Sequence, residues 1–381
     1  MAGIYIHIPF CASRCIYCAF YSTTHTRLRR AYAEAVCREA EWRSDYLGAD
    51  EKVETIYFGG GTPSQMEPEL LSEIVGTIRR CFTTADEVEM TIECNPDDVT
   101  PEWAESIRRI GFNRASMGAQ TFSDSRLRFI QRRHTSAQTV SAVKVLRHSG
   151  MRNISIDLMF GFPGQTLGEW ADDIGNAIRL DVEHISAYGL TYEEGTRLHR
   201  MRECGEVQEA DENLSAMMYE MLIDRLEQSG YEHYELSNFA RSGFRSRHNS
   251  AYWKSVPYIG LGAAAHSYDG ESRQWNVADA EGYIRIMQTE RREGLFEREM
   301  LDRDTRYNDL VATSLRTSEG ISLSQIERDF GSSHLDYFLA NAKRGIENKL
   351  LRHTADRICL TRKALFISDG VICDMMMVTN D

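Results

Sequence analysis

Short β-rich runs and helical patterns alternate along the first half of the chain. The predicted strands are IYIHIPF, VETIYF, EVEMTIE, NRASMG, ISIDLMF and HISAYGL. The predicted helices between them cover residues 27–47, a segment from about Glu67, a segment opened by Thr100 and Pro101, Ala137 to Leu146, and Trp170 to Ile178. Strands that alternate with helices form parallel sheets, because each helix carries the chain back across the sheet. The rhythm therefore predicts an α/β fold with a partial (β/α)6 TIM-like barrel, closed or nearly closed, over residues 1–200.

The rhythm changes after about Gly195. A helical pattern over Glu209 to Gln228 leads to the strand-like run YEHYELS and to a loop rich in glycine and aromatic residues, SRHNSAYWKSVPYIGLGAAAHSY. After Asp304 come helical segments, a hairpin in LLRHTADRICLT and a last helix. This pattern predicts a connecting segment over residues 201–300 and a mostly helical C-terminal domain over residues 301–381 that contains a winged-helix-like module.

The composition limits the classes of function. The 381 residues are 42% hydrophobic, which is enough for a substantial core, and the net charge is -13. Surfaces that bind nucleic acid are usually basic, whereas this chain is acidic. We therefore expect the winged-helix-like module to serve in packing or in docking of a partner, and we expect no nucleic acid as a partner. No run of about 18 apolar residues and no basic leader are present, and we expect a cytoplasmic protein.

Three cysteines stand close together directly after the first predicted strand. Cys11, Cys15 and Cys18 have the spacing C-x-x-x-C-x-x-C, whereas the other six are scattered and the odd total does not suit a disulfide framework. Zinc sites usually take four ligands from two separated pairs, and no second pair follows at a suitable distance. A cubane of four irons normally takes four thiolates, so three would leave one iron open to another ligand. Metal-free thiols so close together would be an oxidation liability.

This spacing, on the loop after the first barrel strand, resembles the signature of the radical SAM family. The resemblance implies a 4Fe-4S cluster held by Cys11, Cys15 and Cys18, with the amino and carboxylate groups of S-adenosylmethionine (SAM) on the open iron. Tyr17 also fits the family, in which an aromatic ring at this position lies near the adenine.

Polar or glycine-rich segments recur at the carboxyl ends of the predicted strands, where TIM-like barrels bind their ligands. Each of them alone is as typical of a solvated strand terminus as of a ligand contact. Similarity to the branch that contains the oxygen-independent coproporphyrinogen III oxidases implies SAM contacts at Tyr5, Gly60, Gly61, Thr62, Glu93, Gln120, Arg132 and Asp157, with Ala187 on the adenine side. Arg133 lies beside Arg132, and either could instead be a surface charge.

The resemblance covers nearly the whole chain, through HIPFCASRCIYCAF, YFGGGTPS, IECNP, SMGAQTF, IDLMFGFPGQT and YGLTYEEGT. Two features differ from the coproporphyrinogen dehydrogenases of the branch. Phe20 stands where those enzymes have a fourth cysteine, and only four residues precede Tyr5 where they carry an N-terminal extension. RHNSAYW instead resembles the H-N-x-x-Y-W motif of the HemW group of heme chaperones, through His248, Asn249, Tyr252 and Trp253.

The resemblance to HemW implies a protein that binds heme and transfers it to apo-acceptors such as respiratory hemoproteins, with transient docking at a membrane surface. Neutral imidazole is a common axial ligand of heme iron, and His248 is the candidate. The alternative is that His248 has a structural role. We assign a structural role to His266. The hypotheses for the role of the cluster are that it promotes dimerisation, that it gates heme transfer, or that it cleaves SAM for a substrate not yet assigned. We expect no catalytic residue and no classical turnover. The alternative function is that of a coproporphyrinogen III dehydrogenase, which performs a SAM-dependent oxidative decarboxylation.

Overall fold

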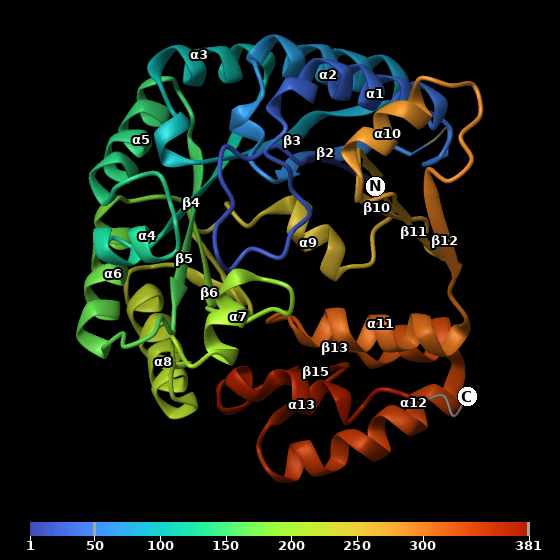
Figure 1. Ribbon diagram of the computed structural model, residues 1–381. Helices are drawn as coiled ribbons and strands as arrows, with labels where there is room; N and C mark the ends of the chain where they lie inside the picture. Colours follow the sequence, from blue (N-terminus) through green and yellow to red (C-terminus); the bar gives the residue numbers. More distant parts are fainter. Residues whose placement is uncertain (49–50, 379–381) are drawn as a thin grey trace.

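The computed structural model describes residues 1–48 and 51–378 (Figure 1). Twelve strands form one sheet in the order β12-β11-β10-β9-β1-β2-β3-β4-β5-β6-β8-β7. Its parallel centre consists of β1 (Ala2–Ile8), β2 (Val53–Gly60), β3 (Thr84–Cys94), β4 (Arg114–Gln120), β5 (Asn153–Phe160), β6 (His184–Gly189) and β9 (Tyr258–Leu261). The helices that follow β1 to β5 are α1 (Arg29–Trp42), α2 (Pro68–Cys81), α3 (Pro101–Ile110), α4 (Asp124–Phe129), α5 (Ser136–His148) and α6 (Leu167–Arg179).

The predicted partial barrel is therefore confirmed, with six successive parallel strands and helices outside them. The helix that begins at Pro101 shows how local chemistry sets an element boundary. The Thr100 hydroxyl accepts a hydrogen bond from the Trp103 amide at 3.2 Å, and Pro101 occupies the first turn, where no amide donor is needed. The helix ends at Gly111, whose φ of 113° is left-handed.

The second half of the chain extends the same sheet at both ends. Its elements are α7 (Arg197–Glu203), α8 (Glu212–Gln228), β7 (Glu232–Glu235), β8 (Asn238–Ala240), α9 (Arg247–Trp253), β10 (His266–Tyr268), β11 (Ser272–Asn276), α10 (Ala280–Met287) and β12 (Phe296–Met300). Antiparallel β8 and β7 follow β6, while β9 pairs parallel with β1 and carries β10 to β12. The sheet stays open, since β7 and β12 are its two ends.

One prediction for this half was wrong. The segment from Ser246 to Tyr268, expected as a loop, contains α9, β9 and β10. Short elements rich in glycine and alanine lack a clear hydrophobic period, and β9 becomes a strand because β1 offers it a free edge.

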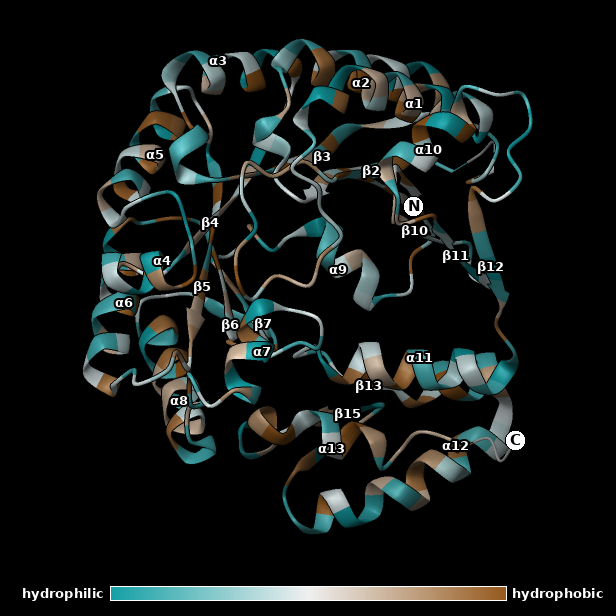
Figure 2. Ribbon diagram, viewed as in Figure 1, coloured by the Kyte–Doolittle hydropathy of each residue, from teal (hydrophilic) through white to brown (hydrophobic). Residues whose placement is uncertain are grey.

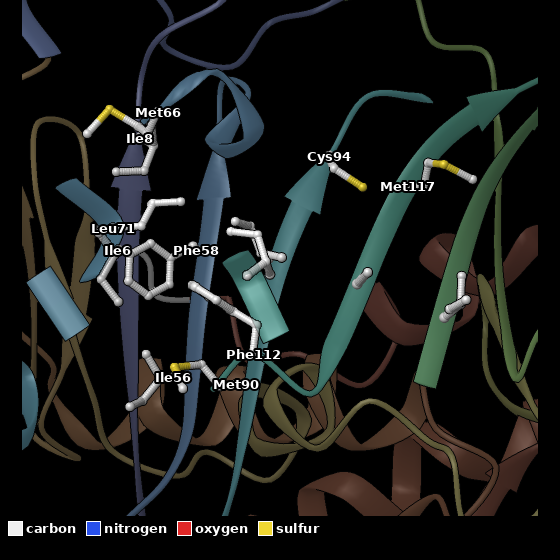
Figure 3. Close-up of a cluster of buried hydrophobic side chains, with 14 of the residues drawn as sticks. Ile6, Ile8, Ile56, Phe58, Met66, Leu71, Met90, Cys94, Phe112 and Met117 are labelled. Carbon is white, nitrogen blue, oxygen red and sulfur yellow. The ribbon is translucent and has the colours of Figure 1, made fainter. Parts of the chain in front are cut away.

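The two faces of the sheet differ in polarity. Alternate residues of the strands point toward the helices and form the main core, as Ile6, Ile56, Phe58 and Met90 do in Figure 3. We call the opposite side the inner face. It carries the intervening side chains of β1 to β6, which are mostly polar or aromatic: Tyr5, His7, Thr55, Tyr57, Glu89, Thr91, Glu93, Arg114, Ser116, Gln120, Asn153, Ser155, Asp157, His184 and Ser186.

The C-terminal region has a hydrophobic core of its own, formed by residues 307–375. It contains α11 (Arg303–Leu315), β13 (Ile321–Ser322), α12 (Leu323–Glu347), β14 (Leu351–Thr354), β15 (Arg357–Leu360) and α13 (Ser368–Cys373). The order of helices followed by the β14–β15 hairpin matches the winged-helix-like expectation. Helices of both regions carry hydrophilic as well as hydrophobic residues (Figure 2), since one side of each packs on a core. The described residues also include four short 3-10 helices: Thr26–Leu28, Pro63–Gln65, Pro96–Asp98 and Arg362–Ile367.

A buried carboxylate fastens α1 to the β9–β12 extension. Glu39 accepts hydrogen bonds from the Arg43 guanidinium at 2.9 Å, the Gly262 amide at 2.8 Å, the Asn276 side chain at 2.8 Å and the Tyr283 hydroxyl at 2.7 Å. Glu39 is 0% exposed and Arg43 is 5% exposed. Because the Glu39 carboxylate accepts four hydrogen bonds, one of them from the Arg43 guanidinium, the burial of these two charges is tolerated.

Removal of this carboxylate should destabilise the fold strongly. We expect Glu39→Ala to lower the free energy of unfolding by about 3–5 kcal/mol, because Arg43 would remain buried without its counter-charge. Urea denaturation of the purified chain measures the difference. The matched control is Glu41→Ala on the same helix, an exposed carboxylate, which should change the value by less than about 0.5 kcal/mol. Similar losses in both variants would contradict this account.

Candidate functional site

The three clustered cysteines lie on the loop that follows β1, at the carboxyl ends of the parallel strands. The Cys11 amide donates to the Thr23 carbonyl at 2.9 Å, which holds the start of the loop against its end. In the middle, the Ile16 amide donates to the Ile130 carbonyl at 3.4 Å, and the Ile16 carbonyl accepts from the Leu198 amide at 2.8 Å. These three apolar side chains also share a small buried cluster. The loop is thus fixed at several points by residues distant in sequence.

All three thiols are half-buried. Cys11 Sγ lies 3.4 Å from Thr62 Oγ1, and the Arg132 guanidinium lies 3.7 Å from Cys15 Sγ. Burial raises the pKa of the Cys11 and Cys18 thiols, so that ionisation requires a cation nearby. Iron would supply that cation, and thiolates are the ligands of iron–sulfur clusters. The donor set therefore fits such a cluster.

A site for a single metal ion would require several ligands to surround one point. Within residues 1–48 and 51–378, no three His, Cys, Asp or Glu side chains are grouped so that they could hold one ion. A four-iron cluster does not require its cysteines to surround one point, because each cysteine binds a different iron.

The structure distinguishes the two adjacent arginines. The Arg132 guanidinium donates to Asn95 Oδ1 at 2.7 Å and to the Gly118 carbonyl at 2.6 Å, besides its contact with Cys15. Arg133 instead pairs with Asp97 and Asp98, each at 2.9 Å. Arg132 therefore faces the cysteine loop, as the prediction of a ligand contact requires.

The glycine run after β2 is shaped by its own surroundings. Gly60 has a φ of 109°, and a Cβ there would lie 2.5 Å from the His7 ring. A Cβ on Gly61 would lie 2.7 Å from the backbone of Pro9. The run thus lets the end of β2 pass close to β1 and its loop, and its contribution to a ligand site would come from backbone groups and from the Thr62 hydroxyl.

Two carboxylates lie on the inner face near the cysteine loop. Glu93 accepts hydrogen bonds from the Tyr57 hydroxyl at 2.8 Å and from the Gly60 amide at 3.1 Å. Burial raises the pKa of Glu93 to about 7 and the pKa of Asp157 on β5 to about 6. A cationic ligand would shift both groups toward the ionised form, so the pair suits a ligand that carries an ammonium or sulfonium group.

The remaining predicted SAM contacts have different settings. Tyr5 lies on the inner face of β1, and Gln120 ends β4 with a φ of 65°. Tyr17 lies in the cysteine loop, where burial raises the pKa of its hydroxyl. The Ala187 methyl lies in the main core and its amide donates to the Ser237 carbonyl at 2.8 Å, so a ligand contact there would involve other backbone atoms. These assignments stay predictions.

Sequence reasoning missed three residues of this region. His7 hydrogen-bonds to the Tyr5 hydroxyl at 3.1 Å through Nδ1 and to the Tyr21 carbonyl at 3.0 Å through Nε2, and burial lowers its pKa to about 4. Asn95 anchors Arg132. Arg114, at the start of β4 and away from the cysteine loop, is a buried cation on the inner face. The alternation IYIHI carried a signal for His7, but the other two depend on contacts between strands.

His248 lies near the opposite end of the strands, on α9, which packs over the inner face of β1 and β2 (Figure 1). Its Nδ1 is 2.8 Å from Thr55 Oγ1, its Nε2 is 2.8 Å from the Tyr252 hydroxyl, and its ring stacks on Tyr57 with 5.0 Å between centroids. It is 2% exposed, and burial lowers its pKa to about 3. The imidazole is therefore neutral, but both nitrogens have partners, and iron ligation would require one of these bonds to break.

The other residues of the motif connect α9 to its surroundings. Tyr252 packs edge-on against Tyr258 at 4.6 Å between centroids. Trp253 lies beneath the Arg316 guanidinium of the C-terminal region, 5.9 Å from its ring centroid. His266, the second histidine considered, is exposed on β10 and lies 6.2 Å from the Trp275 ring.

Comparison with known proteins agrees with this arrangement. The model of the Radical SAM superfamily matches residues 5–175, and that of the HemN C-terminal domain matches residues 301–367. The chain is 33% identical to the heme chaperone HemW of Lactococcus lactis, with 96% of this chain and 95% of that protein covered. It is 32% identical to the HemW of Bacillus subtilis, over 97% and 98%. The chain belongs to the HemW family of radical SAM proteins.

Among solved structures, coproporphyrinogen III oxidase (HemN) from Escherichia coli superposes with a TM-score of 0.85 at 22% identity, covering 99% of this chain and 90% of that one. This likeness confirms the fold of the HemW-family chain. In the part of the chain that the structure describes, no helix is long and apolar enough to cross a membrane.

The raised pKa of Glu93 predicts a pH dependence. The folded protein holds this proton more tightly than an unfolded chain with a glutamate pKa near 4.5, so the stabilisation is complete at low pH and is lost as the pH rises through about 7. Without metal or ligand, we expect the wild type to lose about 2 kcal/mol of unfolding free energy from pH 5 to pH 8 relative to Glu93→Gln. Urea unfolding at each pH measures this difference. Glu41→Gln should retain the wild-type slope, and equal slopes in all three proteins would refute the assignment.

Proposed function

We propose that this protein is a heme chaperone that binds heme, transfers it to apo-acceptors such as respiratory hemoproteins, and carries a SAM-binding 4Fe-4S cluster. The observation that carries the proposal is the similarity, over nearly the whole chain, to proteins named as heme chaperones. Transient docking at a membrane surface would bring heme to membrane acceptors, and assembly into a homodimer belongs to the same hypothesis.

Cys11, Cys15 and Cys18 are the proposed cluster ligands, and the cluster would supply an iron with an open coordination position for SAM. Arg132 would balance the negative charge of the thiolates from its position 3.7 Å from Cys15 Sγ. Glu93 and Asp157 would face the positive charges of SAM, while Tyr5, Tyr17, Gly60, Gly61, Thr62, Gln120 and Ala187 would complete the site.

The fold does not separate this function from the dehydrogenase alternative, since HemN shares it. Phe20 supports the chaperone. It is 73% exposed at the edge of the cysteine loop, where the resembling dehydrogenases have a further cysteine. The proposal therefore assigns the cluster and SAM to a heme-handling protein without a catalytic residue.

The cluster assignment predicts the effect of single cysteine substitutions. Each of Cys11→Ala, Cys15→Ala and Cys18→Ala should lower the iron and sulfide content after anaerobic reconstitution at least fivefold, because a cubane with two protein ligands is poorly held. Cys204→Ala, which changes an exposed cysteine elsewhere, is the matched control and should bind as the wild type does. Iron analysis and electron paramagnetic resonance with and without SAM provide the measurements. Full iron content in all three variants would exclude this ligand set.

The heme assignment predicts opposite effects of two neighbouring substitutions. His248→Ala should weaken heme binding at least tenfold by removing the axial ligand. Tyr252→Phe should strengthen it about threefold, since it removes the hydrogen bond on Nε2 that iron must displace. Heme titration followed by absorption spectroscopy measures both.

A second inner-face histidine offers a matched control for this experiment. His184 Nε2 lies 2.8 Å from the Tyr234 hydroxyl, and its Nδ1 lies 2.7 Å from Ser155 Oγ. Tyr234→Phe frees that histidine in the same way and should leave heme affinity unchanged. If His248→Ala binds heme with wild-type affinity and spectrum, His248 is not the ligand.

A further inference from the structure

A row of polar side chains without partners crosses three neighbouring strands on the inner face. Thr91 on β3 is in register with Arg114 on β4, which is in register with Asn153 on β5. Residues in register on adjacent parallel strands lie about 4.8 Å apart and point to the same side of the sheet. Among the described residues, Thr91 Oγ1, Arg114 Nε and Asn153 Oδ1 are all buried without a hydrogen-bond partner.

The central member of this row is the least expected. Arg114 is 1% exposed, and its guanidinium forms no ion pair with any carboxylate of the described residues. A buried charge without a contacting partner costs several kcal/mol, whereas most buried polar groups in proteins are paired. The carboxylates of Asp157 and Glu93, whose pKa values the Arg114 charge lowers, offset part of this cost from a distance, and a ligand outside the chain would supply the missing contact.

Two of the three carboxylates on the inner face are engaged elsewhere. Glu89 accepts the amides of Arg247 and His248 at the start of α9, at 3.2 and 3.1 Å. Glu93 accepts from Tyr57 and Gly60. Burial raises the pKa of Asp157, farther along β5, and the charge of Arg114 is the largest effect that opposes this rise, although the two side chains form no ion pair.

The three groups together match one ligand chemistry. A guanidinium presents a planar fork of donors that fits a carboxylate in bidentate fashion. The Thr91 hydroxyl can donate to the same oxygens, and the Asn153 amide can present either its nitrogen or its oxygen by rotation about its last bond. Water would satisfy the hydrogen bonds but would leave the charge unpaired.

We propose that Thr91, Arg114 and Asn153 form a binding site for the carboxylate of a ligand, separate from the SAM site. Thr91 is in register with Tyr57 on β2, whose ring stacks on His248 at 5.0 Å between centroids, so the row lies near the proposed heme ligand. A porphyrin propionate is one source of the carboxylate and a small free carboxylate is the other. The first source rests on the proposed heme function.

The test compares heme with its dimethyl ester, in which both propionates are blocked. In the full-length, cluster-loaded protein we expect the wild type to bind heme at least tenfold more tightly than the ester. Arg114→Gln should lose most of this preference while it retains its affinity for the ester. Spectroscopic titration measures both affinities, and circular dichroism reports whether the variant is folded.

Thr91→Val provides a variant that does not depend on the loss of a charge. Its hydroxyl has no partner in the chain, so replacement by a methyl group of similar shape should leave folding intact and should reduce the preference about threefold. Thr139→Val on α5 is its matched control, since Thr139 is also buried with an unpartnered hydroxyl but lies in the helix layer. It should leave the preference unchanged.

Free propionate distinguishes the two sources. A rise in the midpoint of thermal unfolding with millimolar propionate in the wild type, absent in Arg114→Gln, supports a site for small free carboxylates even where the heme preference is unaltered. If neither the preference nor the rise depends on Arg114 or Thr91, the row holds only water and the proposal is overturned. If neither heme nor its ester binds, the heme function fails, while the propionate measurement still decides the carboxylate site.

Discussion

The strict alternation of apolar and polar residues in β1 to β6 is the constraint on which the structure depends. Parallel strands covered by helices on both sides are usually apolar throughout, whereas here only the side facing α1 to α6 is. A fully buried Ile or Phe on that side stabilises the fold by roughly 1.5–3 kcal/mol. This stabilisation offsets the cost of an inner face that holds carboxylates, arginines and histidines away from water.

The sequence predicted what is encoded locally. The βα rhythm, the capping of α3 by Thr100 and the cysteine spacing each depend on residues a few positions apart, and each appears in the structure. The strand β9 was missed, because its four residues, Tyr258–Leu261, lie along β1, more than 250 residues earlier, and all four pair with it. A pattern read along the chain contains no information about such a partner.

The candidate site likewise has a part that the sequence predicts and a part that depends on contacts between distant residues. The topology alone places Glu93, Gln120 and Asp157 on neighbouring strands near one edge, as the rule for parallel barrels requires. The topology does not reveal which of the adjacent residues Arg132 and Arg133 faces the cysteine loop. That choice follows from Asn95 and the Gly118 carbonyl, which accept from Arg132, and from two aspartates that hold Arg133. The topology also does not reveal that the His248 ring is hydrogen-bonded to Thr55 on one side and to Tyr252 on the other.

The two ends of the inner face carry different chemistry and still share one side chain. From Arg114 to Gln120 the strand β4 rises about 20 Å at roughly 3.3 Å per residue, so the cysteine-loop end and the start of β4 are separate. Tyr57 lies between them. Its hydroxyl donates to Glu93 at 2.8 Å, and its ring stacks on His248 at 5.0 Å between centroids. A displacement of Glu93 therefore cannot leave the packing of His248 unchanged unless the Tyr57 hydrogen bond breaks, because a rigid ring transmits the motion of its hydroxyl to its face.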